Sequence, residues 1–171
     1  PGLGDYFLED ANWPIGEIER QINVLRQMGV QGQAHFRARY ITRNVKGIYE
    51  NTFTSCKSLK SVSIGKNCAT IAPTAFSSTT ALEKITVSAD NEKYSSVDGA
   101  LLNKEKTSII LYPKSKSGEF VIPDTVTSIA DRAFSSCPNL TKITIGANVE
   151  SVGAYAFSEC IALTDVVFKD S

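Results

Sequence analysis

The chain has 171 residues and equal numbers of acidic and basic side chains, so its formal net charge is zero. That length is enough for one domain with a sizeable core. The lack of a basic surplus argues against nucleic acid as a partner, because phosphate binding needs a basic face. No apolar run reaches the length that spans a bilayer, so we predict no membrane span.

The N-terminal segment predicts a helix followed by a strand. In "NWPIGEIERQINVLRQMG", Pro14 suits the first helical position, and Gly29 ends the segment. Between them runs one apolar stripe at helical spacing, made of Ile15, Ile18, Ile22 and Leu25. We interpret the next segment, "HFRARYIT", as a strand of a divergent half-repeat, and we predict that the helix covers it. We therefore predict an N-terminal helix and strand cap over residues 1–43.

Residues 44–171 repeat themselves. Phenylalanine recurs at Phe53, Phe76, Phe134 and Phe157, with separations of 23, 58 and 23 residues. Around each Phe, apolar residues recur at matching offsets, and the exception is Thr79, where the other units have cysteine. A fixed period of this length is typical of a solenoid, in which each unit buries its apolar side on the next.

Each unit predicts an extended entry, one short helical turn and a strand. In "VTSIADRAFSSCPNLTKITIG", Ala133, Phe134 and Cys137 have the spacing of a helical turn, which the Pro-Asn pair then ends. Ile143 and Ile145 alternate with polar residues, as in a half-buried strand. Stacked units would form a mostly parallel sheet and a ladder of phenylalanine rings.

An insertion, at about residues 89–121, separates the second and third units. Asp98 and Gly99 are a turn signal, and a second turn is predicted near residues 104–106. The segments "ALLN" and "TSIILY" lie between and after these turns, so we predict an inserted β-hairpin. Cap, repeats and insertion form one structural domain in this prediction.

The segment "IPDTVTSIADRAFSSCPNLTKITIG" resembles the BspA-type leucine-rich repeat, and "YSSVDGALLNKEKTSIILYP" resembles the hairpin insertion of that family. The resemblance covers about residues 41–168. It implies an α/β-type leucine-rich-repeat solenoid with short helical turns. It also implies an exported or cell-surface protein associated with adhesion and with binding a host extracellular-matrix or plasma protein.

The strand side of the units supplies the candidate binding face. If Leu140, Ile143 and Ile145 point inward, their neighbours point to solvent. The candidate residues across the units are Ser61, Ser63, Lys84, Thr86, Lys142, Thr144, Asp165 and Lys169. This face is small, polar and without aromatic residues, which suits a protein partner better than a sugar.

No residue pattern indicates catalysis. The sequence has no nucleophile elbow, phosphate-binding loop, CxxC pair or calcium-ligand loop, and its single histidine, His35, reads as a surface or capping residue. We therefore predict no enzyme, no cofactor and no metal site. The predicted function is a secreted or cell-surface module for protein interaction and adhesion.

Two alternatives to that function stay open. One is a structural spacer that presents another domain, and the other is a glycan-binding module of a polysaccharide-processing system. An exposed aromatic cluster of Tyr94, Tyr112 and Phe120 would favour glycan binding. Packing of the tyrosines onto the solenoid would favour the other two functions.

The last strand predicts an open edge. It contains Val166 and Phe168, and no further unit follows it in this sequence. Exposed strand edges template further pairing. We therefore predict self-association through the C-terminal edge, or a junction there to further sequence.

The positions of the four cysteines in the repeats indicate free thiols. Cys56, Cys137 and Cys160 occupy the repeat position that Thr79 fills, which indicates that a small apolar side chain is wanted there. Disulfides are the alternative, since an even number of cysteines suits a secreted chain. We expect Cys137 and Cys160 to be buried, unpaired and slow to react.

Overall fold

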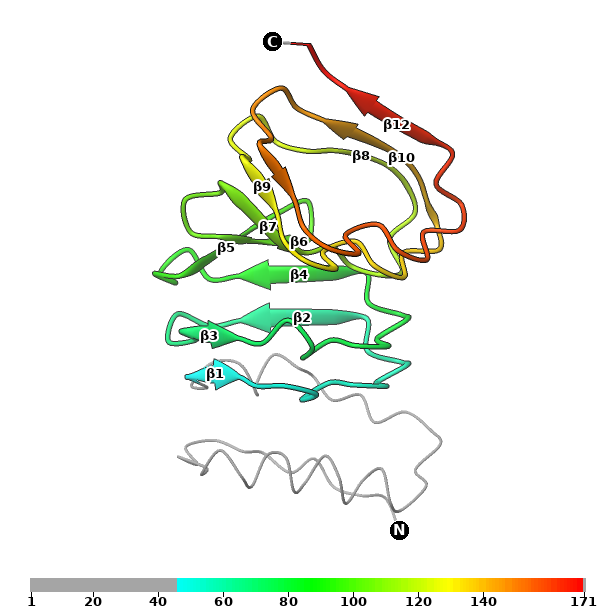
Figure 1. The fold of residues 1–171 in the computed structure, drawn as a ribbon. Coiled ribbons are helices and arrows are strands. Elements are labelled where there is room, and N and C mark those ends of the chain that lie inside the picture. Colours follow the sequence, from blue (N-terminus) through cyan, green and yellow to red (C-terminus); the bar gives the residue numbers. More distant parts are fainter. Residues whose placement is uncertain (1–45, 171) are drawn as a thin grey trace.

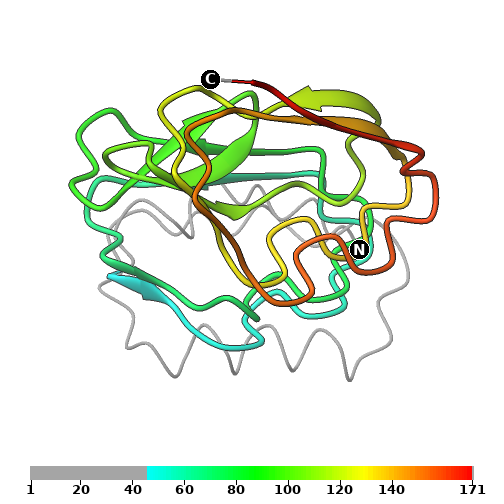
Figure 2. The same ribbon diagram turned by 45° about the horizontal axis from the view of Figure 1, so that its top comes forward.

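The structure, a computed structural model, describes residues 46–170 and shows a stack of coils (Figure 1). A typical coil contains a short entry strand, a run of turns and a longer strand. Strands of neighbouring coils pair in parallel because every coil follows the path of the one before. Figure 2 shows the turn segments of successive coils lying one above another. The predicted solenoid is confirmed.

Two kinds of parallel strand recur along the stack. The entry strands are β1 (Gly47–Ile48), β3 (Thr70–Ile71), β9 (Ser128–Ile129) and β11 (Ser151–Val152). The longer strands are β2 (Ser61–Ile64), β4 (Lys84–Val87), β8 (Gly118–Val121), β10 (Leu140–Ile145) and β12 (Asp165–Phe168). Most registers join residues 23 positions apart, such as Gly47 with Thr70 and Lys142 with Asp165. The sequence period is therefore the offset between neighbouring coils.

The insertion forms two antiparallel strand pairs. Strand β5 (Tyr94–Val97) pairs with β6 (Ala100–Asn103), and β6 pairs with β7 (Ser108–Leu111). The first turn has positive φ at Asp98 and Gly99, 49° and 83°, as a two-residue hairpin turn of the type I′ kind requires. The second turn contains Lys106 at φ 60°. Both predicted turns are confirmed, and β7 then returns the chain to the stack by pairing in parallel with β9.

The parallel pairing is divided among four sheets. The longer strands form a β2–β4 sheet and a β8–β10–β12 sheet, and β1 pairs with β3. The fourth sheet joins the hairpin strands to the entry strands in the order β11–β9–β7–β6–β5. The predicted parallel stack is therefore interrupted, and the interruption lies at the insertion.

Two hydrophobic clusters fill the stack, and β6 lies between them. Its successive residues Leu101 and Leu102 are both fully buried, and they pack into different clusters. Both faces of β6 are therefore covered. This explains why "ALLN" is continuously apolar rather than alternating.

Each cluster holds part of the predicted phenylalanine ladder. Phe53 and Phe76 stack with their ring centroids 5.2 Å apart. In the second cluster, Phe134 stacks between Tyr112 and Phe157, at 4.9 and 5.1 Å. Tyr112 thus takes the aromatic position in the coil that β7 and β8 form. Its hydroxyl is buried without a hydrogen-bond partner, and nothing in the structure explains why tyrosine stands there.

The prediction of short helical turns is wrong for the described residues, which contain no helix. Arg132 and Ser136 adopt left-handed conformations, with φ of 58° and 57°, and these break a right-handed helix. The backbone N–H of Phe134 donates to Ala156 O of the next coil at 2.9 Å. The backbone N–H groups of Arg132 and Ser136 also donate to backbone oxygens of the next coil. Hydrogen bonds between coils thus replace the bonds that a helix would make within itself.

The predicted N-terminal cap lies outside the described residues. This applies to the helix from Pro14 to Gly29 and to the strand that follows it. Within residues 46–170, no helix has the length and apolar character needed to cross a membrane. The four cysteines all lie in the described part, and Cys68, Cys137 and Cys160 are free thiols, as predicted.

Candidate functional site

The predicted binding face begins on the sheet of β2 and β4. Ser61 lies opposite Lys84, and Ser63 lies opposite Thr86. Thr86 Oγ1 donates to Ser63 Oγ at 3.1 Å, so these two hydroxyls form one polar pair across the strands. Val62 and Ile64 alternate with the two serines and are buried. The period-2 pattern therefore explains which side chains reach solvent here.

The other predicted residues lie on the sheet of β8, β10 and β12. Lys142 lies opposite Asp165, and Thr144 lies opposite Val167. Lys169 follows β12, and its Nζ lies 3.3 Å from Asp124 Oδ1. These four predicted residues are all exposed or half-buried.

The eight predicted residues form two groups of four rather than one continuous face. The edge of β4 is taken by the insertion, because Ile85 N donates to Gly99 O at 2.8 Å. A β-carbon at Gly99 would lie 3.1 Å from Lys84 Cβ, so the turn packs closely on this strand. Strand β8 therefore does not pair with β4, and the two sheets present separate surfaces.

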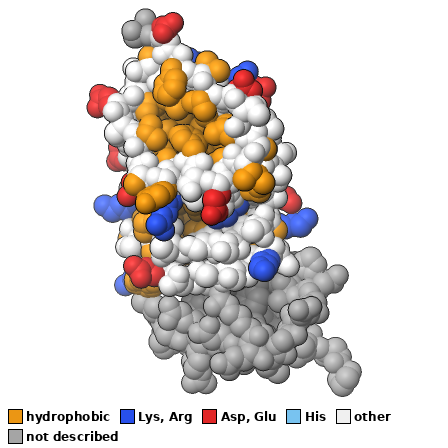
Figure 3. Space-filling model, turned by 45° about the vertical axis from the view of Figure 1, so that its right-hand side comes forward, with side chains coloured by type: hydrophobic (Ala, Val, Ile, Leu, Met, Phe, Trp, Pro, Cys, Tyr) orange, Lys and Arg blue, Asp and Glu red, His pale blue; other side chains and the backbone are white. Residues whose placement is uncertain are grey.

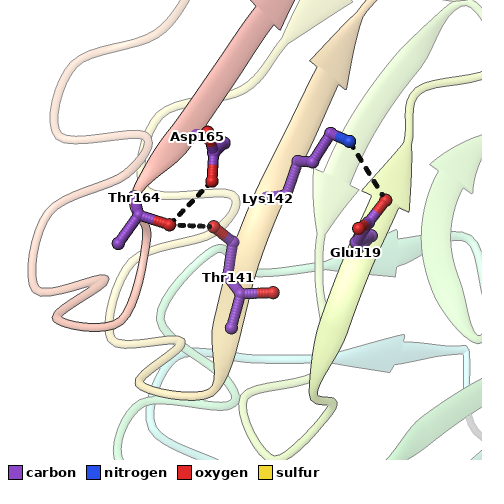
Figure 4. Close-up of polar contacts among 5 residues, drawn as sticks. All are labelled: Glu119, Thr141, Lys142, Thr164 and Asp165. Carbon is purple, nitrogen blue, oxygen red and sulfur yellow. Dashed lines mark hydrogen bonds and ion pairs between the residues drawn. The ribbon is translucent and has the colours of Figure 1, made fainter.

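The second sheet presents what we call the C-terminal strand face. Its residues are Glu119, Val121, Lys142, Thr144, Asp165 and Val167, two from each strand. Figure 4 shows Glu119, Lys142 and Asp165 side by side across the three strands. Lys142 Nζ lies 3.4 Å from Glu119 Oε2, and Thr164 Oγ1 donates to Asp165 Oδ2 at 2.8 Å.

The row of charges on this face alternates in sign. The side chains of Lys142 and Glu119 are 37% and 63% exposed, so water screens their attraction. Exposed pairs of this kind stabilise a fold by only about 0–1 kcal/mol. The row therefore contributes little to the stability of the fold.

The neighbouring row of the same face is largely apolar. Val121 and Val167 lie on either side of Thr144 in the strand register, and they are 53% and 42% exposed. The C-terminal strand face therefore combines an exposed aliphatic row with a charged row beside it.

Sequence reasoning missed Glu119 and Val121. Both lie in the segment predicted to be the insertion, although they stand one period of 23 residues before Lys142 and Thr144, with which they pair. The signal that could have found them is Phe120, which pairs with Ile143 and is buried in the same cluster.

The three aromatic residues of the insertion do not form an exposed cluster. Tyr112 and Phe120 are buried, with 0% and 4% exposure. Tyr94 is half-buried, and its hydroxyl accepts a hydrogen bond from Ile71 N at 2.9 Å. The aromatic platform that would have favoured glycan binding is therefore not built from these residues.

A second exposed apolar surface lies at the C-terminal end of the stack. Phe168 is 70% exposed, although Ile145, its partner in the coil before, is only 4% exposed. Ile161 is 85% exposed. Val152, Tyr155 and Val166 are also exposed. Figure 3 shows hydrophobic side chains gathered toward this end of the molecule. Residues 46–170 contain no group of three side chains that could hold a metal ion.

Comparison with known proteins agrees with this architecture. The model of the BspA type leucine rich repeat region matches residues 17–97 and 110–171 of the chain, in 6 copies. The chain belongs to the BspA-type leucine-rich repeat family. The second matched stretch begins within β7, which agrees with a coil formed by β7 and β8.

Solved structures of similar bacterial proteins share this fold. A leucine rich cell surface protein from Faecalibacterium prausnitzii is 34% identical, with a TM-score of 0.64 over 73% of this chain and 33% of its own. The pneumococcal vaccine antigen PcpA is 30% identical, with a TM-score of 0.61 over 64% of this chain and 27% of its own. A leucine-rich repeat protein from Eubacterium ventriosum is 30% identical, with a TM-score of 0.51 over 67% and 37%.

The chain spans about a third of the length of these solved relatives. No curated protein matches it.

Proposed function

We propose that this chain is a non-enzymatic interaction module of a secreted or cell-surface protein, and that it binds a protein partner through the C-terminal strand face. The observation that carries the proposal is the exposed Val121–Thr144–Val167 row beside the charged Glu119–Lys142–Asp165 row. Protein interfaces combine an apolar centre with a polar rim in this way.

The proposed location rests on the family and its solved members. One of the similar structures is named a cell surface protein, and another is named a vaccine antigen. The partner class, a host extracellular-matrix or plasma protein, follows from the family resemblance of the sequence. A sheet face with an aliphatic row beside a charged row suits a protein surface.

The two alternative functions differ in what they require of this face. A spacer requires no ligand at all, and the packed state of Tyr94 and Tyr112 is compatible with it. A glycan-binding module requires exposed rings, and the insertion buries Tyr112 and Phe120. The structure therefore offers more support to protein binding or spacing than to glycan binding.

The binding proposal predicts that Thr144→Arg weakens partner binding at least about tenfold, because a long charged side chain between the two valines would remain unpaired at the interface centre. The first measurement is a parallel screen of the purified chain against matrix proteins, plasma proteins and a glycan array. Affinities of the variants for any protein retained are then compared. Glu105→Arg, an exposed change in the second hairpin turn, is the matched control.

The screen also separates the three functions. Retention of a matrix or plasma protein that Thr144→Arg releases and Glu105→Arg keeps supports the proposal. Thr86→Arg tests whether the β2–β4 sheet shares in binding. Binding to glycans alone favours the polysaccharide-processing function, and binding to nothing in either set favours the spacer.

Self-association is proposed through the C-terminal end of the stack. Phe168 and Val166 are exposed there, and β12 has one unpaired edge among the described strands. We expect the molar mass from light scattering to rise with concentration, and Phe168→Asp to abolish the rise because it places a charge in the apolar contact. A monomer at every concentration, with β12 amides as protected from hydrogen exchange as those of β10, would contradict this.

A further inference from the structure

Two cysteines face each other across neighbouring coils. Cys137 and Cys160 each follow the aromatic ring of their coil by three residues, and those rings stack 5.1 Å apart. The register is held by Ser136 N, which donates to Ser158 O at 2.8 Å, and by the same kind of bond from Phe134 N. Equivalent positions in the two coils are therefore direct neighbours.

The two thiols are in contact. Cys137 is fully buried, and its thiol is hydrogen-bonded to that of Cys160, which is half-buried. Disulfide-bonded cysteines have Cα atoms about 4.4–6.8 Å apart, so the two residues must be direct neighbours. The hydrogen bond from Ser136 N to Ser158 O joins the backbones of the two coils just before the cysteines. Together with the contact between the thiols, this arrangement is compatible with a disulfide bond.

The surroundings make the two sulfurs unequal. The hydrogen bond from the Cys137 thiol lowers the pKa of Cys160 to about 7, although partial burial acts in the opposite direction. A hydrogen bond from the backbone of Cys137 and the Lys114 ammonium add to the lowering, and Glu159 is an acidic neighbour of that ammonium. The same thiol–thiol bond, together with burial, raises the pKa of Cys137.

Lys114 is placed to act on both sulfurs. It is buried, and its Nζ donates to Ser135 O at 2.8 Å, in the turn that leads to Cys137. In its neutral form, the Cys160 thiol donates to Phe134 O at 3.1 Å, a bond that the thiolate loses. The bonds from Cys137 and the nearby ammonium compensate for that loss. Cys160 is thus the accessible nucleophile, and Cys137 is the protonated thiol behind it.

We propose that Cys137 and Cys160 form an oxidisable dithiol that low-molecular-weight disulfides convert to a disulfide bond between the last two coils. The Cys160 thiolate attacks one sulfur of the small disulfide, forming a mixed disulfide and releasing one thiolate. Cys137 then loses its proton to water and attacks Cys160 Sγ, which releases the second small thiolate. The two protein thiols are oxidised, and one small disulfide is reduced to two thiols.

The other two cysteines lack this arrangement. Cys56 occupies the same repeat position, but its neighbour in the next coil is Thr79, whose hydroxyl donates to Phe76 O at 2.7 Å. Cys68 is buried with its pKa raised by burial, and it donates to Thr70 O at 3.6 Å. Slow reaction was expected of Cys137 and Cys160. The raised pKa of Cys137 agrees with that expectation, whereas the lowered pKa of Cys160 argues against it.

The test treats the full chain with excess oxidised glutathione at neutral pH and maps thiols by mass spectrometry without reduction. We expect a mass lower by two hydrogen atoms, a cross-linked peptide pair containing Cys137 and Cys160, and alkylatable Cys56 and Cys68. In the untreated protein, iodoacetamide should label Cys160 at least about tenfold faster than Cys68, because far more of it is thiolate. Dithiothreitol should restore all four thiols.

Two variants keep the result decisive. Cys56→Ala/Cys68→Ala retains only the proposed pair, and it should still form the bridge. Cys160→Thr, which copies the side chain at position 79, should form none while keeping a cooperative thermal transition. A stable glutathione adduct on Cys160 without a bridge, a bridge to Cys56 or Cys68, or a full set of free thiols after treatment would each overturn the proposal. Because no step involves the strand face, failure here leaves the binding proposal untouched.

Discussion

Replacing Phe134 with alanine is expected to lower the free energy of unfolding by about 3–5 kcal/mol, the range for truncating a buried aromatic side chain. Phe134 is fully buried, and it packs against rings on both sides, Tyr112 at 4.9 Å and Phe157 at 5.1 Å. It also lies 5.8 Å from Phe120. Removing the ring therefore opens a cavity shared by three coils, and the backbone bonds between the coils resist collapse around it.

Urea unfolding of Phe134→Ala and the parent chain measures this effect. Phe157→Ala is the matched control, because Phe157 is the last ring of the stack and is only half-buried. Its loss should be smaller than that of Phe134. A Phe134→Ala loss below about 1 kcal/mol would contradict the role of this ring in the core.

The second large effect is expected at Asn91. This side chain is fully buried, and its Nδ2 donates to Gly65 O at 2.8 Å and Cys68 O at 2.9 Å. Its Oδ1 accepts from Lys93 N and Tyr94 N at 2.9 and 2.7 Å. One side chain thus joins the turn after β2 to the start of the insertion.

Asn91→Ala should destabilise the chain by about 2–4 kcal/mol. Each of the four backbone groups that bond to Asn91 costs about 1–3 kcal/mol if it is left buried without a partner, and the total is smaller than their sum because water reaches some of these groups. Urea unfolding again gives the value. Asn148→Ala is the control, since Asn148 is exposed and donates one bond, to Asp124 O at 2.7 Å. Equal losses for the two variants would show that burial of Asn91 adds nothing.

The binding face and the dithiol belong to different parts of the coil. The C-terminal strand face consists of longer strands, whereas Cys137 and Cys160 follow the turns. Figure 2 shows these turns gathered away from β8 and β12. Oxidation would therefore tie the last coil to its neighbour without altering the side chains of the face. A disulfide there constrains the unfolded chain, so we expect the oxidised protein to melt at a higher temperature.

Repetition is the property that the sequence alone determines. Every coil must bury the same kind of side chain on the next coil, so apolar residues recur at matching offsets and can be read without a structure. The parallel register, the two hairpin turns and the outward direction of Ser61, Lys84, Thr144 and their equivalents all follow from that period and from strand alternation.

Tertiary structure alone decided the conformation of the turns, the division of the face and the pairing of the thiols. Around Phe134, the spacing of the apolar residues suits a helical turn and the observed turn equally well. Hydrogen bonds to the next coil favour the left-handed backbone conformation of Arg132 and Ser136. The face divides because Gly99 occupies the edge of β4. Cys137 and Cys160 become partners only when coils stack, since contacts between residues 23 positions apart depend on the whole register rather than on local sequence.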